Sequence, residues 1–227
     1  MAEIVLVHGA WSDGSAWLEV IPALHRQGHR VRAAHLPMTS LADDIAEVRR
    51  EAAAFDGPVV LAGHSYGGAV ISGAAKDNPQ VSALAYFAAY VPDEGENVPS
   101  LNGKFPASPG NDAMVFTEDG WSSPDPDRFH YAFAADVAPE RAAALAAAQR
   151  RARAECFAVP AGPGAWHDLP TAYAVSTEDR ILQPDLQRWL AERAGADCVE
   201  LAASHYSLWS QPDAVATVID KVAARGK

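Results

Sequence analysis

Cysteine is nearly absent from this sequence, since only Cys156 and Cys198 occur among its 227 residues. Two cysteines so far apart in the chain supply neither a disulfide framework nor a C-x-x-C metal or redox motif, so we expect free thiols. The sequence also lacks an H-E-x-x-H motif, a G-x-G-x-x-G loop and a P-loop. These absences predict chemistry that uses neither a metal ion nor a bound cofactor.

Basic residues are scarce. The 18 Lys and Arg residues face 29 Asp and Glu residues, which gives a formal net charge of -11. Nucleic-acid binding needs clustered positive charge, and the basic trio of Arg150, Arg151 and Arg153 is more simply the solvated face of an Ala-rich helix. We therefore expect no nucleic-acid partner. An acidic surface gives no general help in capturing anions, which favours a neutral small-molecule substrate.

Long apolar runs are lacking as well. No run approaches the roughly 18 apolar residues of a membrane span, and Met1 leads into the apolar stretch 4–7 without a basic region. We expect no membrane partner and a cytoplasmic location. The proportions of 49% hydrophobic and 21% charged residues are typical of globular proteins, and the length suits one domain over residues 1–227.

Short apolar, β-branched runs alternate with helical segments along most of the chain. The spacing predicts strands at 3–8, 30–35, 58–62, 83–91, 171–176 and 198–202. Helices are predicted between and after them, at 15–27, 41–55, 65–76, 184–194 and 213–224. Strands separated by helices imply a sheet that is covered on both faces. The prediction is an α/β fold with a six-stranded, mostly parallel, doubly wound sheet.

Residues 92–169 interrupt this alternation. They hold many of the prolines, several aromatic residues and an Ala-rich stretch that predicts a helix at 139–154. A long insertion in a compact domain is usually functional, so we expect a small helical cap without strands of its own after the fourth strand. Apolar surface on such a cap would allow a homodimer.

The segment Gly63-His64-Ser65-Tyr66-Gly67 follows an apolar strand and leads into a helix of small residues. This is the context that the nucleophile-elbow motif G-x-S-x-G requires, because the serine occupies a strained turn and the glycines let strand and helix approach closely. Ser65 is therefore the predicted nucleophile.

A serine nucleophile needs a base, and the base needs a group that orients it. In the strand-helix order predicted here, the acid and then the histidine follow the serine, each on a loop after a later strand. Asp179 follows the fifth strand and His205 the sixth, so these two are predicted to complete a triad. Glu178 is a neighbouring alternative acid, and Asp93 or Glu94 after the fourth strand is a more distant one.

The loop His8-Gly9-Ala10-Trp11 follows the first strand. A loop in this place supplies one oxyanion donor, and the residue after the nucleophile supplies the other. We expect the backbone N–H groups of Ala10 and Tyr66 to be these donors. His8 and His64 are expected to have structural roles.

With these motifs the sequence resembles the compact α/β-hydrolases that include plant methylesterases acting on salicylate and jasmonate esters, plant hydroxynitrile lyases and bacterial pyrethroid-type esterases. The resemblance covers nearly the whole chain and is carried by residues 5–10, 28–31, 63–68, 177–179, 187–189 and 204–205. It implies a triad of Ser65, Asp179 and His205 and favours Asp179 over Glu178.

Three positions depart from patterns within that family. Tyr66 stands where Leu or Met is usual, and its ring is expected to narrow the pocket. The rubber-tree type of lyase has Thr in place of Gly9 and Lys in place of Tyr206, so the resemblance favours hydrolysis. The prediction is a carboxylesterase that cleaves a small, largely apolar ester or lactone through an acyl-enzyme. A cofactor-free carbon-carbon lyase and a ligand-sensing protein that retains the triad are the alternatives.

The substrate pocket is expected between cap and core, because small-molecule sites are concave and mostly apolar. Some of the following aromatic residues are predicted to line it: Trp11, Phe87, Trp121, Phe129, Phe133 and Trp166.

Overall fold

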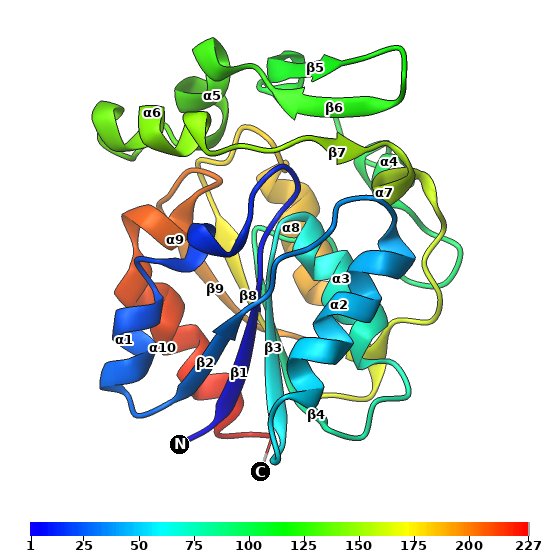
Figure 1. Ribbon diagram of the computed structural model, residues 1–227, viewed down its shortest axis with the longest axis vertical. Coiled ribbons are helices and arrows are strands. Elements are labelled where there is room, and N and C mark those ends of the chain that lie inside the picture. Colours follow the sequence, from blue (N-terminus) through cyan, green and yellow to red (C-terminus); the bar gives the residue numbers. More distant parts are fainter. Residues whose placement is uncertain (227) are drawn as a thin grey trace.

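A six-stranded parallel sheet forms the centre of the computed structural model, which describes residues 1–226 (Figure 1). Its strands lie in the order β2-β1-β3-β4-β8-β9, and every neighbouring pair is parallel. The bounds are β1 Glu3–Val7, β2 Arg30–Ala33, β3 Val59–His64, β4 Val81–Phe87, β8 Thr171–Ser176 and β9 Asp197–Leu201. The predicted doubly wound α/β sheet is confirmed.

Helices cover both faces of this sheet and bury two separate hydrophobic cores. Alternate residues of β1 show the division, since Ile4 and Leu6 face one core while Val5 and Val7 face the other. On one face lie α1 Ile21–Arg26, α9 Ser207–Ser210 and α10 Pro212–Ala223; on the other lie α2 Leu41–Ala53, α3 Tyr66–Ala75 and α8 Pro184–Arg193 (Figure 1). This accounts for the mainly apolar sequences of β3 and β8, whose residues are all buried.

The segment predicted as one helix at 15–27 is two. A 3-10 helix spans Gly14–Trp17, and α1 begins only at Ile21. Pro22 stands in the first turn of α1, where its missing N–H has no cost, whereas a continuous helix would have required that N–H.

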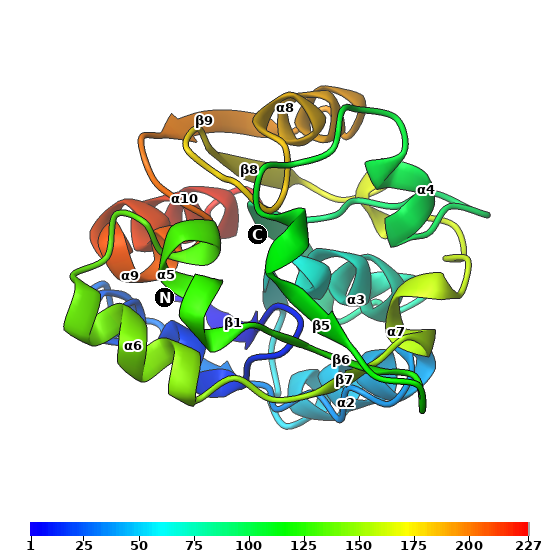
Figure 2. The same ribbon diagram turned by 90° about the horizontal axis from the view of Figure 1, so that it is seen from above.

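The insertion between β4 and β8 covers the carboxyl ends of the strands (Figures 1 and 2). It contains α4 Val98–Asn102, α5 Pro126–Phe133, α6 Pro139–Ala147 and α7 Glu155–Ala158, with short 3-10 helices at Asn111–Ala113 and Ala165–His167. It also contains an antiparallel sheet of β5 Met114–Phe116, β6 Trp121–Pro124 and β7 Ala152–Arg153.

The expectation of a cap without strands is therefore wrong. β5 and β6 form a hairpin whose turn includes Gly120 at φ 82°. The Asp119-Gly120 pair is a turn signal that the sequence carries. The helix predicted at 139–154 ends at Ala147, because Ala152 and Arg153 pair with β6 instead.

None of the helices in residues 1–226 has both the length and the apolar character needed to cross a bilayer. The thiols of Cys156 and Cys198 are free.

Candidate active site

Ser65 lies at the sharp turn between β3 and α3. Its backbone has φ 54° and ψ −123°, a region that costs a non-glycine residue on the order of 1–3 kcal/mol. Hydrogen bonds fix this turn, since the Ser65 N–H donates to Phe87 O at 3.1 Å and Ser65 O accepts from the N–H groups of Gly68 and Tyr90 at 3.0 and 3.1 Å. The strained turn presents the serine side chain at the carboxyl end of the sheet.

The glycines of the elbow are required by close backbone approach. A Cβ atom on Gly63 would lie 2.7 Å from Gly67 O, and one on Gly67 would lie 2.6 Å from both Val7 O and His8 O. The atoms that such a Cβ would meet belong to the backbone, which cannot move aside as a flexible side chain can. The structure therefore accounts for the spacing of the G-x-S-x-G motif.

His205 and Asp179 meet on the loops after β9 and β8. Nδ1 of His205 lies 2.6 Å from Oδ2 of Asp179, and both side chains are buried. The other carboxylate oxygen accepts from the N–H groups of Ile181 and Leu182 at 2.7 and 2.9 Å, and Gln187 Nε2 donates to Oδ2 at 2.9 Å. Because a carboxylate can only accept, Nδ1 of His205 carries the proton and Nε2 is left as the basic nitrogen.

The alternative acids lie elsewhere. Glu178 is exposed to solvent. Asp93 pairs with His167 at 3.0 Å, and Glu94 is exposed beside it. Of the acids weighed from the sequence, Asp179 is the one bonded to His205.

Ser65 and His205 border the same small hollow, together with Phe133 and the loop Gly9–Trp11. Within residues 1–226 no hydrogen bond joins the two side chains. Catalytic hydrogen bonds are often long or misaligned in unliganded sites and tighten when substrate binds.

His8 holds the loop after β1. Its Nε2 accepts from the Leu36 N–H at 3.0 Å, so Nδ1 carries the proton and donates to Gly9 O at 2.7 Å. Burial lowers the pKa of His8 to about 4, and the ring is therefore neutral near pH 7. This matches the structural role expected for His8.

The cap completes the support of the same loop. The Arg150 N–H donates to Trp11 O at 2.5 Å, and the Trp11 indole N–H donates to Ser122 Oγ at 3.0 Å. Trp11 has φ 63°, which is a strained conformation for a tryptophan. The backbone N–H groups of Ala10 and Tyr66, beside Ser65, donate to no acceptor in residues 1–226. Both remain available to a substrate oxygen.

His64 packs behind His205, the predicted base. Its Nε2 donates to His205 O at 2.8 Å, and the two ring centroids are 4.7 Å apart. Burial, and then the nearby His205, holds the pKa of His64 well below its usual range. A neutral His64 that fixes the backbone of His205 agrees with the structural role expected from the sequence.

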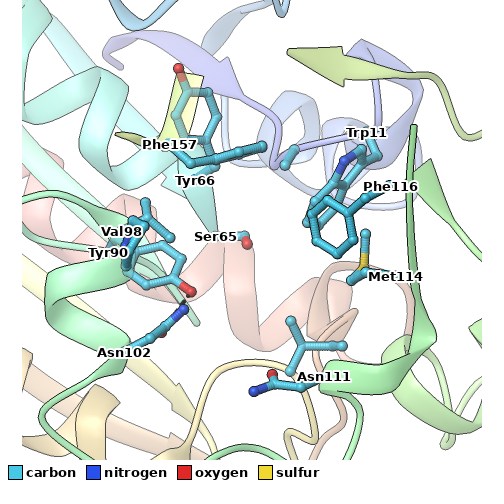
Figure 3. A pocket seen from close by; sticks show the side chains of 13 residues that line it. Trp11, Ser65, Tyr66, Tyr90, Val98, Asn102, Asn111, Met114, Phe116 and Phe157 are labelled. Carbon is cyan, nitrogen blue, oxygen red and sulfur yellow. Dashed lines mark hydrogen bonds between the residues drawn. The ribbon is translucent and has the colours of Figure 1, made fainter. Parts of the chain in front are cut away.

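A cavity of about 330 Å³ opens in front of Ser65 (Figure 3). One side is apolar, with Trp11, Met114 and Phe116, and none of the lining residues is charged. Tyr90 and Asn102 form a polar corner in which the tyrosine hydroxyl donates to Asn102 Oδ1 at 3.0 Å. The cavity suits a small, neutral and mainly apolar molecule.

Two of the six aromatic residues predicted for the pocket lie at the site. Trp11 lines the cavity, and Phe133 borders the hollow next to Ser65, with its ring edge-on to His205 at a centroid distance of 5.8 Å.

The other four lie outside the cavity lining, and the expectation is corrected for them. Phe87 points to the face of the sheet that α1 and α10 cover, and it packs edge-on against Trp17. Phe129 is buried in that core and stacks on Phe133 at 5.0 Å. Trp166 is buried with its indole N–H on a backbone carbonyl, and Trp121 lies under the guanidinium group of Arg153.

Sequence reasoning missed several residues of the cavity, among them Tyr90, Asn102, Met114, Phe116 and Phe157. Tyr90 had a usable signal, because it lies just beyond the carboxyl end of β4, where ligands bind in open α/β sheets. The others are in short cap elements whose sequence carries no comparable signal.

Residues 1–226 contain no group of three or more His, Cys, Asp and Glu side chains placed to hold a metal ion.

The chain is similar to known proteins over nearly its whole length. A model described as the alpha/beta hydrolase family matches residues 4–218. A carbendazim hydrolyzing esterase from Nocardioides sp. is 39% identical over 115 residues, a match that covers 44% of this chain and only 47% of that protein. Salicylic acid-binding protein 2 from Nicotiana tabacum is 23% identical over 96% of both chains.

Solved structures share the fold. A pyrethroid hydrolase from Sphingobium faniae superposes with a TM-score of 0.84 at 24% identity, covering 98% of this chain and 97% of that chain. Polyneuridine aldehyde esterase gives a TM-score of 0.84 at 22% identity over 98% of this chain and 99% of that chain. At such identities the superpositions establish the fold alone.

Proposed function

Since this chain belongs to the alpha/beta hydrolase family, we propose that it is a serine carboxylesterase that cleaves a small, largely apolar ester or lactone through an acyl-enzyme. Relatives named as esterases and hydrolases support hydrolysis of small substrates. The observation that carries the proposal is the buried His205–Asp179 pair at 2.6 Å, which borders the same hollow as Ser65 in its strained turn.

In the first half of the reaction, Ser65 Oγ attacks the ester carbonyl carbon while His205 Nε2 takes the hydroxyl proton. The carbonyl oxygen becomes an oxyanion, which accepts hydrogen bonds from the Ala10 and Tyr66 amides. Asp179 holds the imidazole tautomer and stabilises the imidazolium. His205 then gives its proton to the leaving alkoxy oxygen as the C–O bond breaks, and the acyl group remains on Ser65.

In the second half, His205 Nε2 takes a proton from water, and the water oxygen attacks the acyl carbon. The tetrahedral intermediate collapses, Ser65 Oγ recovers the proton and the acid leaves. The uncharged cavity favours a neutral substrate, because burying an unpaired charge there would be costly. Gly9 has no side chain that would crowd the oxyanion site, and this favours hydrolysis over lyase chemistry.

The test measures hydrolysis of p-nitrophenyl acetate and butyrate by wild type, Ser65→Ala and Asp179→Asn. Each variant is expected to lose roughly 10³-fold or more in kcat/KM, an amount typical of triad disruption. Glu178→Gln is the matched control, because it removes the neighbouring exposed carboxylate and should stay near wild type. Wild type should also release p-nitrophenol in a burst. The proposal fails if Ser65→Ala keeps the activity.

A further inference from the structure

Asp44 is a buried carboxyl group that the proposed mechanism does not use. It lies in the first turn of α2 and is 0% exposed. Its Oδ2 accepts from the Tyr66 hydroxyl at 2.8 Å, and its Oδ1 accepts from the Met38 N–H at 2.8 Å. No ion pair of Asp44 occurs in the described chain. Because burying a carboxyl group without a cation is unfavourable, its place behind the active site calls for an explanation.

The two buried titratable groups beside Asp44 are neutral. Burial, with Asp44 as the next cause, raises the pKa of the Cys156 thiol on α7 to about 12. Burial and then Asp44 hold the pKa of Tyr66 well above its usual range. The phenol therefore stays protonated and donates a hydrogen bond to the carboxyl group. Asp43, the neighbour on α2, bonds instead to Thr39 and Ser40 at the exposed surface.

Tyr66 connects this carboxyl group to the cavity, since its hydroxyl bonds to Asp44 and the residue is one of those that line the cavity. Its ring meets Phe157 edge-on at a centroid distance of 5.3 Å, and Figure 3 shows the two rings together on one side of Ser65, across from Trp11 and Phe116. Met38, the second partner of Asp44, is itself tied to the cap, since its carbonyl accepts from the Arg153 N–H at 3.0 Å. The ring is therefore held at its tip as well as at its backbone.

The path of the proton in the proposed mechanism decides which part of the ester lies near Tyr66. In the proposed mechanism His205 gives its proton to the leaving alkoxy oxygen, which places the alkoxy group on the side of Ser65 where His205 and Phe133 lie. Tyr66 and Phe157 line the larger cavity and do not border the small hollow that His205 shares with Phe133. In that orientation the acyl group extends away from His205, toward the part of the cavity that Tyr66 and Phe157 line.

We propose that Asp44 is a positioning residue that fixes the Tyr66 ring as a rigid wall and thereby limits the length of the acyl group that the site accepts. The inference rests on the proposed esterase function. A free tyrosine ring can rotate about two side-chain bonds, but a ring with its hydroxyl anchored in a dry site cannot turn aside for a longer chain. Short acyl groups are the expected substrates.

The test compares kcat/KM for p-nitrophenyl octanoate with that for the acetate. Tyr66→Leu removes the ring and should raise the octanoate-to-acetate ratio by roughly tenfold or more, because the added methylenes gain apolar space. Tyr66→Phe and Asp44→Leu each remove the hydrogen bond between Tyr66 and Asp44 without removing the ring, and each should raise the ratio about threefold. The octanoate-to-acetate ratio of the double variant should be no higher than that of either single variant, because both substitutions remove the same hydrogen bond.

The matched control is Tyr86→Phe, which removes another buried tyrosine hydroxyl, one bonded to Ser72 at 2.8 Å and outside the cavity. A merely structural effect of losing a buried hydroxyl would change this variant as well. Its octanoate-to-acetate ratio should equal that of wild type.

Binding to Ser65→Ala proteins separates this inference from the proposed function. Dissociation constants for the two intact esters are measured in the Ser65→Ala background with and without Tyr66→Leu. Tyr66→Leu should strengthen binding of the octanoate relative to the acetate by a factor similar to the change in the kcat/KM ratio. If wild type hydrolyses neither ester, the proposed function fails while the binding comparison still decides the inference. An unchanged ratio in Tyr66→Leu, or independent effects of Tyr66→Phe and Asp44→Leu, overturns the inference.

Discussion

Acidification should destabilise this protein through His8. The ring is fully buried and uses both nitrogens, accepting from the Leu36 N–H and donating to Gly9 O. A proton on Nε2 would break the first bond and bury a charge, a cost that the nearby Asp13 offsets only in part. Burial accordingly lowers the pKa of His8 from 6.5 to about 4.

The size of the effect follows from these two pKa values. Between pH 6.5 and about 4 the unfolded chain binds a proton at His8 and the native chain does not, so the free energy of unfolding falls as the pH falls. At 1.36 kcal/mol per pKa unit, the whole loss is about 3 kcal/mol, and about 2 kcal/mol of it has occurred by pH 5. Above pH 6.5 the contribution is constant. His64, whose pKa is also lowered, adds to the loss in the same direction.

Urea unfolding at pH 7.5 and pH 5.0 measures this loss. His8→Gln removes the titrating group, so its stability should fall by about 2 kcal/mol less than that of wild type over the same interval. His25→Gln changes an exposed histidine and should keep the wild-type dependence. The reasoning is refuted if His8→Gln loses as much stability as wild type, because the acid sensitivity then arises elsewhere.

Two further variants test the support of the site. Gln187→Met removes a buried amide that bonds Asp179 and two backbone groups; the free energy of unfolding should fall by about 2–4 kcal/mol in urea titrations, and kcat should fall more than KM changes. The exposed Gln27→Met is its control, and equal effects would contradict the reasoning. Gly67→Ala should prevent stable folding, judged by circular dichroism and thermal unfolding, whereas Gly162→Ala, with open space around the added methyl group, should be neutral.

The sheet and the proposed triad could be predicted because their signals are local or topological. The G-x-S-x-G motif marks one turn, and strand order alone brings the loops of Asp179 and His205 to the same end of neighbouring strands β8 and β9. Gln187, by contrast, was recognised only within a family motif. Its bond to Asp179 depends on how α8 packs against β8, and no local sequence pattern predicts that packing.

Pocket residues were harder to predict because aromatic side chains serve cores and ligand sites equally well. Phe87 and Tyr90 both come near the end of β4, yet Phe87 alternates onto the face that packs against Trp17 while Tyr90 lies beyond the strand and lines the cavity. Phe116 reaches the cavity from a hairpin, in a cap that was expected to be helical and to have no strands. The placement of such residues follows from tertiary packing, which a single sequence does not reveal.

The cap supports the loop after β1, which carries the proposed oxyanion donor Ala10, as well as enclosing the cavity. Trp11 O accepts from the backbone of Arg150, and the Trp11 indole bonds to Ser122, a contact that joins residues 111 positions apart. These two bonds hold the loop that presents the Ala10 amide. Changes in the cap should therefore alter kcat through the oxyanion donor as well as KM through the cavity, so a cap exchanged between relatives need not transfer substrate preference without also changing the rate.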